Sequence, residues 1–500
     1  MLNEYYAHFK SGTDIRGTAV DGVEGEPLDL TNEAVEEMAT GFLLWLSDYV
    51  EKKVSDLTVS VGRDCRISGE RISACVRDTF KKYGVKVYDC SLSSTPSMFM
   101  STLDIPCDGA VQITASHHPY NKNGLKFFTK NGGLDHGDIT AILQYAQDKT
   151  KPELCDGEEI QINFMKQYAE HLRNLIKEGV NAENYDKPLA GFHIVVDAGN
   201  GVGGFYAGEV LEPLGADVSG SRYLEPDGMF PNHIPNPEND KAMESICEAV
   251  LENKADLGVI FDTDVDRGGA VDSFGKEINR NRLVALSSLI ALEGNKGGTV
   301  VTDSITSTGL TEFLEKELKA HHYRYRRGYK NIINKAVELN EKGINCPIAS
   351  ETSGHVAMRE NYFLDDGAYL CTRIIIKMAV LQKEGRTIDE LLKNLKEPKE
   401  SKEIRIKILE KDFKNCGECV IESLTNYASE QKGWNIAPDN REGIRVSFDK
   451  DNGDGWFLLR LSVHDPILPL NIESDSVGGV EIIEKKVFDF LRENTSGLAL

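Results

Sequence analysis

Three aspartates alternate in the stretch FDTDVDRGG, directly after an apolar run that predicts a buried strand. A loop at the end of that strand can turn Asp262, Asp264 and Asp266 toward one point, and clustered carboxylates suit a hard divalent cation such as Mg2+. A calcium EF-hand is excluded, because its loop needs glycine at the sixth position and glutamate at the twelfth, where this chain has Arg267 and Ser273. A metal-free, solvated acidic turn is the alternative, but three aspartates followed by an arginine favour metal binding.

A serine loop, TASHHPYNKNGLKFF at residues 114–128, offers a second reactive group. No GxSxG elbow surrounds Ser116, which disfavours acyl transfer, and the chain has no GxxxxGKS or GxxxxGKT loop for a nucleotide. Phosphoryl chemistry on Ser116 fits better, since a phosphoserine carries nearly two negative charges and the three aspartates can hold a cation against it. Lys126, after the Asn-Gly turn, can return to the same pocket as an acid–base group or charge partner. The alternative is an ordinary turn serine.

Two further polar loops suit a phosphorylated sugar. SETSGH at residues 350–355 packs Glu351, Ser353 and His355 into a short stretch, and such side chains can hydrogen-bond several hydroxyl groups at once. SGTDIRG at residues 11–17 places Arg16 among glycines and hydroxyl groups, which suits a phosphate. Each loop taken alone is equally well explained as a hydrophilic turn, so neither carries the interpretation by itself.

A GxGxxG spacing occurs in DAGNGVGG, at Gly199, Gly201 and Gly204. A dinucleotide site would need an acidic residue near the end of the following strand, and Asp217 is poorly placed for that role. A tight strand-to-helix turn that needs small residues is therefore the favoured interpretation.

Composition limits the possible partners and the compartment. A net charge of −23 over 500 residues argues against nonspecific binding to nucleic acids or anionic membranes, although a local cluster of Arg and Lys can still bind an anion. No stretch approaches the roughly 20 apolar residues of a membrane span, and the first residues show no signal peptide. Ten cysteines include one CxxC pair, Cys416 and Cys419, without a second pair or histidines at zinc-site spacing. Reduced thiols in a cytoplasmic protein are the simpler interpretation.

Helical and strand patterns alternate along the chain, which predicts largely parallel sheets with crossover helices. The apolar run LTVSVGRD at residues 57–64 precedes a helical pattern and a second strand at 85–90, and the rhythm restarts near residues 191 and 283. The last hundred residues show alternating strands and a final helical segment, an α+β pattern. We predict three similar mixed α/β domains and a smaller C-terminal α+β domain, over residues 1–155, 156–278, 279–395 and 396–500.

Taken together, these motifs resemble those of the α-D-phosphohexomutase superfamily, which includes phosphoglucomutases and phosphomannomutases. TASHHP followed by NGLK resembles the family's active-site serine loop, TASHNP with NGxK; DTDVDR resembles its metal loop, DGDxDR; and ETSGH resembles its sugar loop, GExSGH. SGTDIRG and VGRDCRISGE are similar to its N-terminal FGTxGxRG and GRDxR segments. The motifs keep the family's order over nearly the whole chain.

The resemblance implies four domains around a central cleft and a phosphohexomutase reaction. Ser116 would be phosphorylated in the active enzyme, and a phosphate oxygen of that serine would join the aspartates in binding Mg2+, so the predicted metal ligands are Ser116, Asp262, Asp264 and Asp266. The phosphoserine would pass its phosphoryl group to a glucose- or mannose-type hexose phosphate, and the resulting hexose 1,6-bisphosphate would reorient and return its other phosphoryl group. Phosphate thereby moves between C1 and C6, and the bisphosphate is the expected activator.

The same resemblance assigns roles to single residues. Lys126 and His355 are the candidates for acid–base catalysis, and Arg16 and Arg267 would neutralise charge. The predicted catalytic residues are Ser116, His117, Lys126, Arg16, Arg267 and His355. The predicted substrate-binding residues are Glu351, Ser353, His355, Tyr329, Lys330, Arg460, Ser462 and His464. A small-molecule sugar phosphate is the expected partner, and a monomer or homodimer the expected assembly.

The C-terminal phosphate loop departs from the family's pattern RxSGTEPxxR. In RLSVHDPILPLNIES at residues 460–474, the arginine, serine and proline match, whereas glycine, threonine, glutamate and the second arginine are replaced by Val463, His464, Asp465 and Pro469. One hydroxyl donor and one guanidinium are therefore missing, and an arginine–phosphate hydrogen bond contributes roughly 1.5 to 3 kcal/mol. We expect other groups to help bind the distal phosphate, and the candidates are Arg441, Arg445 and His464.

Further departures concern the substrate rather than the reaction type. Tyr329 stands where the family often has histidine, the second histidine of SHHP replaces asparagine, and Thr352 stands where glucose and mannose enzymes often have methionine and glucosamine enzymes glutamine. A phosphoglucosamine mutase is therefore one alternative. A catalytically weak sugar-phosphate binding protein and a phosphatase are two others, and the altered loop is the only support for the binding protein.

Overall fold

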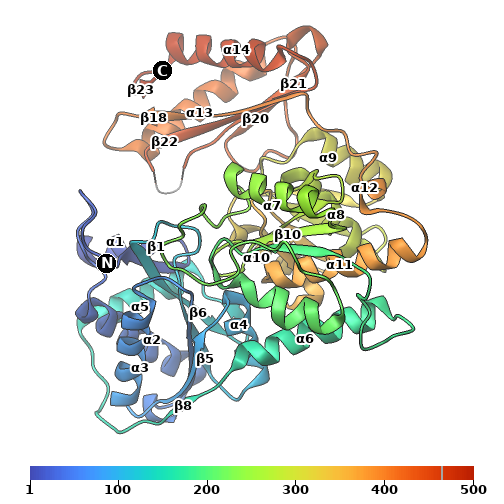
Figure 1. The fold of residues 1–500 in the computed structure, drawn as a ribbon. Coiled ribbons are helices and arrows are strands. Elements are labelled where there is room, and N and C mark those ends of the chain that lie inside the picture. Colours follow the sequence, from blue (N-terminus) through green and yellow to red (C-terminus); the bar gives the residue numbers. More distant parts are fainter. Residues whose placement is uncertain (463–464) are drawn as a thin grey trace. The chain divides into compact units, whose positions relative to one another are not determined.

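The computed structural model describes residues 1–462 and 465–500 (Figure 1). The chain divides into two compact units. The first unit consists of Met1–Ile290 and Ser353–Leu391, and the second of Ala291–Thr352 and Leu392–Leu500. The division falls inside the sugar loop, so Glu351 belongs to the second unit while Ser353 and His355 belong to the first. The four predicted domain boundaries remain predictions.

A mixed eight-stranded sheet carries the serine loop in the first unit, with strand order β1-β2-β6-β5-β3-β4-β8 and β7 paired to β6. Parallel pairs join β3 to β4 and β5, whereas β6 is antiparallel to β5 and β2. All five residues of β5 are buried, as its apolar sequence predicts for a central strand. The strands are β1 (Lys10–Ser11), β2 (Asp14–Thr18), β3 (Thr58–Arg63), β4 (Lys86–Leu92), β5 (Gly109–Ile113), β6 (Lys122–Thr129), β7 (Gly132–Gly133) and β8 (Glu159–Gln161).

Helices cover both faces of this sheet (Figure 1). On one face α2, α3 and α5 bury apolar side chains against β3, β5 and β6, and on the other face lie α4 and α6. The side chain of the N-cap residue Thr31 accepts a hydrogen bond from Ala34 N and so fixes the start of α2. The helices are α1 (Glu4–Phe9), α2 (Asn32–Val50), α3 (Gly69–Lys82), α4 (Thr95–Asp104), α5 (His136–Asp148) and α6 (Phe164–Val180).

A four-stranded sheet with order β12-β11-β10-β9 carries the aspartate loop. β9 (Ile194–Asp197) runs parallel to β10 (Leu257–Phe261), and β11 (Gly268–Asp272) and β12 (Glu277–Ile278) continue the sheet antiparallel. α7 (Asp240–Asn253) packs on this sheet, and α11 (Gly367–Lys383), from a later part of the chain, also contacts β10 and β11. The aspartates thus occupy a short connection between two paired strands, which fixes both ends of their loop.

Short elements complete the first unit. β16 (Val356–Met358) pairs antiparallel with β17 (Leu364–Asp365) just after the sugar loop, and α8 (Arg280–Leu292) leads toward the second unit. The remaining helical turns of this unit are η1 (Val54–Asp56), η2 (Val202–Gly204), η3 (Tyr206–Leu211), η4 (Glu212–Leu214), η6 (Arg359–Asn361) and α12 (Ile388–Leu391).

In the second unit, β13 (Thr299–Thr302) lies between β14 (His321–Arg324) and β15 (Ile348–Ser350), and the three strands are parallel. The helical segments α9 (Thr308–Glu312), η5 (Phe313–Glu317) and α10 (Tyr329–Glu341) connect them. Parallel strands end at one edge of the sheet, which is the usual position of a ligand site in open α/β sheets. Asp303, Arg327 and Glu351 follow β13, β14 and β15 at this edge.

The C-terminal part of the second unit is an antiparallel sheet with order β19-β20-β21-β22-β18-β23 and helices α13 (Phe413–Glu430) and α14 (Gly479–Asn494) on one face (Figure 1). One apolar core includes side chains from both helices and from the strands. The strands are β18 (Glu400–Ile408), β19 (Trp434–Ile436), β20 (Ile444–Phe448), β21 (Gly455–Leu459), β22 (Ile467–Ser474) and β23 (Leu498–Ala499), and η7 (Lys450–Asn452) is a single turn.

The predicted fold class is confirmed, since mixed α/β sheets are followed by a C-terminal α+β domain. Over residues 1–462 and 465–500, we find no helix with the length and apolar content that crossing a membrane requires.

Candidate active site

Ser116 lies in the loop between β5 and β6, with a φ of +51° that residues other than glycine rarely adopt. Such a conformation costs roughly 1 to 3 kcal/mol and persists only where the surroundings fix it. The backbone N–H of Ser116 donates to Thr114 Oγ1 at 2.9 Å, and its Oγ donates to Asp262 Oδ2 at 3.1 Å. The fold therefore brings the predicted phosphoryl carrier to the predicted metal loop, although the two are 146 residues apart in sequence.

Arg66 holds the serine loop in place, a role that its motif did not predict. Its side chain is almost fully buried and pairs with Asp64 at 3.2 Å. It also donates to four backbone oxygens of the loop, those of Ser116, His118, Pro119 and Lys122. Both members of the pair belong to the VGRDCR motif, so the signal was present: a charged pair directly after an apolar strand.

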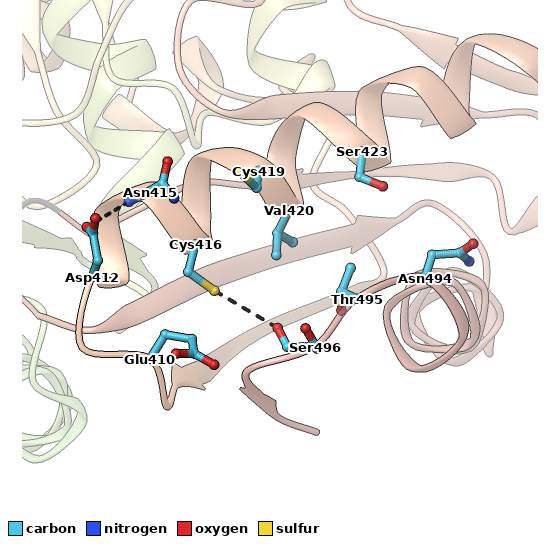
Figure 2. Close-up of a pocket in the computed structure, with 10 residues that line it drawn as sticks. All are labelled: Glu410, Asp412, Asn415, Cys416, Cys419, Val420, Ser423, Asn494, Thr495 and Ser496. Carbon is cyan, nitrogen blue, oxygen red and sulfur yellow. Dashed lines mark hydrogen bonds between the residues drawn. The ribbon is translucent and has the colours of Figure 1, made fainter.

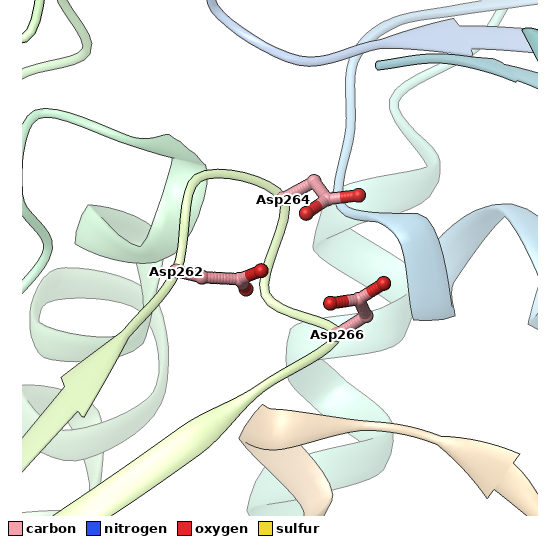
Figure 3. A group of neighbouring side chains, drawn as sticks. All are labelled: Asp262, Asp264 and Asp266. Carbon is pink, nitrogen blue, oxygen red and sulfur yellow. The ribbon is translucent and has the colours of Figure 1, made fainter. Parts of the chain in front are cut away.

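The three aspartates gather their carboxylates at the loop between β10 and β11 (Figure 3). One oxygen atom from each of Asp262, Asp264 and Asp266 lies within 4.8 Å of the others. Val265, between two of them, has a φ of +67°, which is a genuine outlier for a β-branched residue. Its carbonyl accepts a hydrogen bond from Gly367 N at 2.9 Å. The strained turn thus directs three like charges to one place.

Burial and mutual repulsion govern the ionisation of the three carboxylates. Burial raises the pKa of Asp262 well above its usual range, and the charges of Asp266 and Asp264 add to this effect. Burial, with the charge of Asp266, also raises the pKa of Asp264 to about 6. Burial alone would raise the pKa of Asp266 too, but the neighbouring cations Lys126 and Arg267, together with His355, outweigh it and lower this pKa. The cluster therefore needs compensating positive charge.

These residues fit a divalent cation that takes oxygen ligands. Asp264 Oδ1 and Asp266 Oδ1 are buried and have no hydrogen-bond partner within the described part of the chain. Thr95 Oγ1 donates to the other oxygen of Asp264 and so orients that carboxylate from the first turn of α4. Among residues 1–462 and 465–500, this is the one group of at least three His, Cys, Asp or Glu side chains that is spaced to hold a metal ion.

Lys126 and Arg16, both predicted catalytic residues, come from neighbouring strands of the first sheet. Lys126 Nζ on β6 lies 2.9 Å from Asp266 Oδ2 and is buried with it. Arg16 on β2 lies opposite Gly124 on β6 in the strand register. A side chain at position 124 would crowd Arg16, because its Cβ atom would lie 3.0 Å from Arg16 Cγ. Arg16 Nη2 donates to Asp14 Oδ2 at 2.9 Å, and its buried Nε has no acceptor among the described residues. Lys126 thus lies on a strand that flanks the serine loop, and Arg16 lies on the strand paired with it.

Arg267 and His355 form a hydrogen-bonded pair. Arg267 Nε donates to His355 Nε2 at 2.8 Å, and His355 Nδ1 lies 3.3 Å from Asp365 Oδ2. Because Nε2 accepts this bond, His355 in this arrangement orients the guanidinium of Arg267. Ser353 is buried in the same unit. The catalytic role of His355 remains a prediction.

His117 and His118 stack with ring centroids 5.3 Å apart beside the serine. Burial lowers the pKa of His117 to about 2, and Arg267 acts in the same direction. Burial also lowers the pKa of His118 to about 3, with help from Arg16. A neutral His117, whose Nδ1 lies 3.3 Å from Ser116 Oγ, can therefore hydrogen-bond that oxygen without adding charge.

The second unit holds the other predicted substrate-binding residues. Glu351, directly after β15, accepts a hydrogen bond at 2.5 Å from the backbone N–H of Gly328. Tyr329 and Lys330 follow this glycine and begin α10. Thr352 Oγ1 donates to Asp303 Oδ2 at 2.8 Å. The structure thus brings the glutamate of the sugar loop to the start of α10.

The altered phosphate loop begins at the end of β21. Ser462 N donates to Ile467 O at 3.1 Å, and Ser462 Oγ accepts from Asp465 N at 3.3 Å, so the loop is closed by its own hydrogen bonds. Arg460 is half-buried at its base. His464, which was also predicted to bind substrate, lies outside the described residues.

The CxxC pair lines a pocket of about 490 Å³ beside α13 (Figure 2). Cys416 Sγ donates to Ser496 O at 4.0 Å, and burial raises the pKa of Cys416, with Glu410 and Cys419 adding to the shift. A thiol held in its protonated form is a poor metal ligand and a poor nucleophile. All ten cysteines are free, which agrees with the interpretation of reduced thiols.

The glycines of the GxGxxG spacing serve packing. A Cβ atom at Gly201 would lie 2.7 Å from Thr263 O in the aspartate loop, and one at Gly204 would lie 2.0 Å from Leu224 O. Gly199 has a φ of +53°. These contacts agree with the interpretation of a tight turn. The close approach of Gly201 to Thr263 packs this turn against the aspartate loop.

Comparison with known protein families and proteins gives one consistent result. Residues 13–153, 166–275 and 279–398 match the models for phosphoglucomutase/phosphomannomutase, alpha/beta/alpha domains I, II and III. A phosphoglucomutase/phosphomannomutase of Thermococcus kodakarensis is 31% identical over 422 residues, which are 84% of this chain and 86% of that protein. A phosphomannomutase/phosphoglucomutase of Pseudomonas syringae pv. tomato is 29% identical over 428 residues, 85% of each chain.

Solved structures share the fold. A phosphoglucomutase/phosphomannomutase family protein from Burkholderia thailandensis superposes with a TM-score of 0.80 at 24% identity, covering 100% of both chains. Parafusin, a phosphoglucomutase from Paramecium, superposes with a TM-score of 0.70 at 15% identity, covering 96% of this chain and 95% of its own.

Proposed function

Because the chain belongs to the phosphoglucomutase/phosphomannomutase family, we propose that it is a hexose phosphate mutase, an intramolecular phosphotransferase that interconverts hexose 1-phosphates and hexose 6-phosphates. The observation that carries this proposal is the 3.1 Å hydrogen bond from Ser116 Oγ to Asp262 Oδ2. A hydroxyl that can carry a phosphoryl group lies against three buried carboxylates that call for a cation. A phosphorylated Ser116 would therefore meet the counter-charge that it needs.

The proposed reaction moves one phosphoryl group in each of two steps. A hydroxyl of the hexose phosphate attacks the phosphorus of phosphorylated Ser116, the bond from that phosphorus to Ser116 Oγ breaks, and a hexose 1,6-bisphosphate forms. The bisphosphate reorients, Ser116 Oγ attacks the phosphoryl group at the other end, and the isomeric hexose phosphate leaves. Because the serine ends as it began, we propose that hexose 1,6-bisphosphate is the activator that restores a lost phosphoserine.

Charge and proton movements are assigned to groups of the first unit. Arg16 and Arg267 would neutralise the phosphoryl oxygens. In the first transfer Lys126 Nζ would give a proton to the leaving Ser116 Oγ, and the proton lost by the attacking sugar hydroxyl would restore Lys126; in the second transfer Lys126 would take the proton of Ser116 and the leaving sugar oxygen would receive one. Neutral His117 would hydrogen-bond Ser116 Oγ and so keep the nucleophile oriented. When bound by the three aspartates, a divalent cation, which we propose is Mg2+, would reduce the repulsion between the phosphoryl group and the incoming oxygen.

Sugar recognition and cellular location are the finer parts of the proposal. In the second unit, Glu351 would bind hydroxyl groups of the sugar and Tyr329 and Lys330 would line the same site, a grouping that the hydrogen bond from Gly328 N to Glu351 supports. Ser353, which belongs to the first unit, remains a predicted contact for a sugar hydroxyl group. Ten free thiols support a cytoplasmic location. A monomer or homodimer remains the expected assembly.

A coupled assay tests the proposal. Purified protein is given glucose 1-phosphate with Mg2+ and a trace of glucose 1,6-bisphosphate, and glucose 6-phosphate and free phosphate are both measured. We expect mutase turnover with little phosphate release, and a loss of at least about 10⁴-fold in Ser116→Ala. Turnover in that variant close to the wild-type rate would contradict the proposal, and phosphate release without isomerisation would identify a phosphatase. Mannose, glucosamine and N-acetylglucosamine 1-phosphates in the same assay identify the preferred sugar.

A further inference from the structure

All five N–H groups of the Arg66 guanidinium are engaged by other groups of the first unit. Nε donates to Asp64 Oδ2 at 3.2 Å. The four N–H groups on Nη1 and Nη2 donate to backbone oxygens of the serine loop, those of Ser116, His118, Pro119 and Lys122. A guanidinium has five N–H donors and no acceptor, so only its faces remain for further contacts. A tilt of its plane would weaken several bonds to the serine loop at once.

The ring of Phe230 contacts this guanidinium from outside those bonds. Arg66 Cζ lies over the ring, 5.3 Å from its centroid. Since no N–H of Arg66 is left for the ring, the contact is between a cation and a π face. Such contacts are strongest where the cation is withdrawn from water, and Arg66 is 1% exposed. Phe230 therefore opposes a tilt of the guanidinium plane.

Phe230 holds this position in an unusual backbone conformation. Its φ of +49° lies in the left-handed region, where a bulky side chain is an outlier. Its N–H donates to Asp227 O at 3.0 Å and closes a tight turn. Strain of this kind is kept only where the surrounding structure imposes it, and it gathers at positions that matter for function.

The turn before Phe230 packs directly on the chain that carries Arg66. A Cβ atom at Gly228 would lie 2.5 Å from both Cys65 O and Ile67 N, so only a glycine permits this approach. Gly228 is buried, although it lies in a stretch without helix or strand. The backbone of the turn is thus pressed against the two residues that flank Arg66.

Asn200, in the glycine-rich turn after β9, anchors the segment at residues 225–232. Its Nδ2 donates to Glu225 O at 2.9 Å, and its Oδ1 accepts from Asn232 Nδ2 at 2.7 Å. Its backbone oxygen accepts from Asp227 N at 2.8 Å and from Cys65 Sγ at 3.2 Å. One residue therefore holds both ends of the segment and the chain next to the guanidinium.

The same glycine-rich turn fixes the aspartate loop. Val202 N donates to Thr263 O at 2.9 Å, and a Cβ atom at Gly201 would lie 2.7 Å from that oxygen. The turn therefore holds the aspartate loop directly and the serine loop through Phe230 and Arg66. The two loops that must stay aligned share one support.

We propose that Phe230 is a positioning residue for phosphoryl transfer. Its ring fixes the guanidinium of Arg66, and that guanidinium fixes the serine loop in the geometry that the nucleophile needs. The expected effect on the reaction rate rests on the proposed mutase function, whereas the effect on the serine loop does not.

Hydrogen exchange of the full-length protein tests the effect on the loop without turnover. The amides of His118 and Lys122 donate to carbonyl oxygens within the serine loop, so their exchange reports how often the loop opens. Phe230→Leu removes the π face and keeps an apolar side chain. We expect peptides that cover the serine loop to exchange about three- to tenfold faster in this variant than in the wild type.

Two further variants separate the π face from the loss of a surface ring in general. Phe230→Tyr keeps the aromatic ring, and its serine loop should exchange within about twofold of the wild type. Phe488→Leu is the matched control in the second unit, because Phe488 is also half-buried and its ring lies under Arg492 at 5.5 Å from Cζ to centroid. This control should leave the serine loop unchanged. Phe230→Met, which also lacks the ring, replaces Phe230→Leu if the latter does not fold, as judged by its melting temperature.

Steady-state kinetics test the consequence for the reaction. In the glucose 1-phosphate assay, Phe230→Leu should lower kcat by about three- to tenfold and leave KM within about twofold, because alignment of the nucleophile rather than substrate binding is impaired. Phe230→Tyr should recover most of the lost kcat. A raised KM with unchanged kcat in Phe230→Leu would overturn the inference.

The outcomes separate the inference from the function. Serine-loop exchange in Phe230→Leu that equals that of the wild type would overturn the inference, even if the wild type is an active mutase. Equal changes in the leucine and tyrosine variants would also overturn it, because the ring would then not be responsible. An inactive wild type whose serine loop still exchanges faster in Phe230→Leu would overturn the proposed function and support the role of Phe230 in fixing the loop.

Discussion

The serine loop at residues 114–128 and the phosphate loop at residues 460–474 are both proposed to hold a phosphoryl group, but the fold fixes them differently. Arg66 ties the serine loop through four backbone oxygens, and Ser116 itself is held in a strained conformation against Asp262. The phosphate loop is closed by short-range bonds of its own, at Ser462, Asp465 and Ile467.

The difference reflects what each loop must do. Phosphoryl transfer needs the nucleophile and the charged groups aligned to a fraction of an ångström, so its loop is fixed by buried contacts from several elements. A phosphate that is only recognised can be bound by cations from different loops, and the sequence of one of these loops can then change. Four substitutions test this contrast, starting with the largest expected effect.

Substituting one aspartate should break the reaction without weakening the protein. We expect Asp262→Asn to lower kcat by at least about 10³-fold, because the cation site and the partner of Ser116 are lost together. Because burial and like charges disfavour the ionised form of Asp262, the metal-free variant should melt no lower than the metal-free wild type. Asp240→Asn, on the exposed side of α7, is the control and should change neither quantity. A marked loss of stability in metal-free Asp262→Asn would contradict the view that the carboxylates of Asp262, Asp264 and Asp266 repel one another in the metal-free protein.

Removing Arg66 tests whether the serine loop is fixed from outside. Arg66→Met leaves Asp64 buried without its partner, which costs about 3 to 5 kcal/mol of the free energy of unfolding. We expect kcat to fall by about 10²-fold because Ser116 is no longer aligned. Arg63→Met is the matched control: Arg63 pairs with the exposed Glu70, so the change should cost less than about 1 kcal/mol. Equal losses in denaturant titrations of the two variants would show that the buried pair has no special role.

The sequence predicted the reactive groups better than the groups that hold them. The residue types in the motifs around Ser116 and the three aspartates indicate phosphoryl chemistry and metal binding. The apolar run before each motif predicts a strand, so each motif is expected in the loop that follows it. Arg66 was missed because it contacts the serine loop through backbone oxygens. Every residue type has such an oxygen, so the sequence of the loop does not indicate the contact. The hydrogen bond from Arg327 N to Glu442 Oε2 could not be predicted either, since the two residues are 115 positions apart along the chain.

The hydroxyl group of the phosphate loop should matter much less than the serine at the active site. Ser462→Ala removes one proposed hydrogen bond to the distal phosphate, so we expect KM for glucose 1-phosphate to rise by about three- to tenfold with kcat nearly unchanged. The comparison variant is Thr114→Ala, which removes the acceptor for Ser116 N and should lower kcat with little change in KM. A fall in kcat in Ser462→Ala as large as that in Thr114→Ala would remove the distinction between recognition and alignment.

The smallest effect concerns how the second unit tolerates acid. His322 bonds to Thr302 Oγ1 at 2.8 Å and to Thr311 Oγ1 at 2.9 Å, and burial lowers its pKa well below 6.5, with Arg324 and Arg445 acting in the same direction. A folded-state pKa below the unfolded value means that the unfolded state binds more protons. The stability that neutral His322 provides is therefore complete above pH 6.5 and is lost as the pH falls below that value, by at most about 1.4 kcal/mol per pH unit.

His322→Gln should remove this dependence and keep hydrogen bonds to the two threonines. Unfolding of the second unit can be followed by the fluorescence of Trp434 and Trp456, with the third tryptophan, Trp45, replaced by phenylalanine in both proteins. Between pH 7 and 5.5, we expect the stability advantage of wild type over His322→Gln to shrink by about 1 kcal/mol. Asp303 and Glu473 also titrate here, because burial raises the pKa of each to about 7, but they are present in both proteins and cancel in the difference. A stability difference between the two proteins that does not change with pH would mean that the folded protein accepts a proton on His322 as easily as the unfolded chain does. That result would contradict the lowered pKa of this ring.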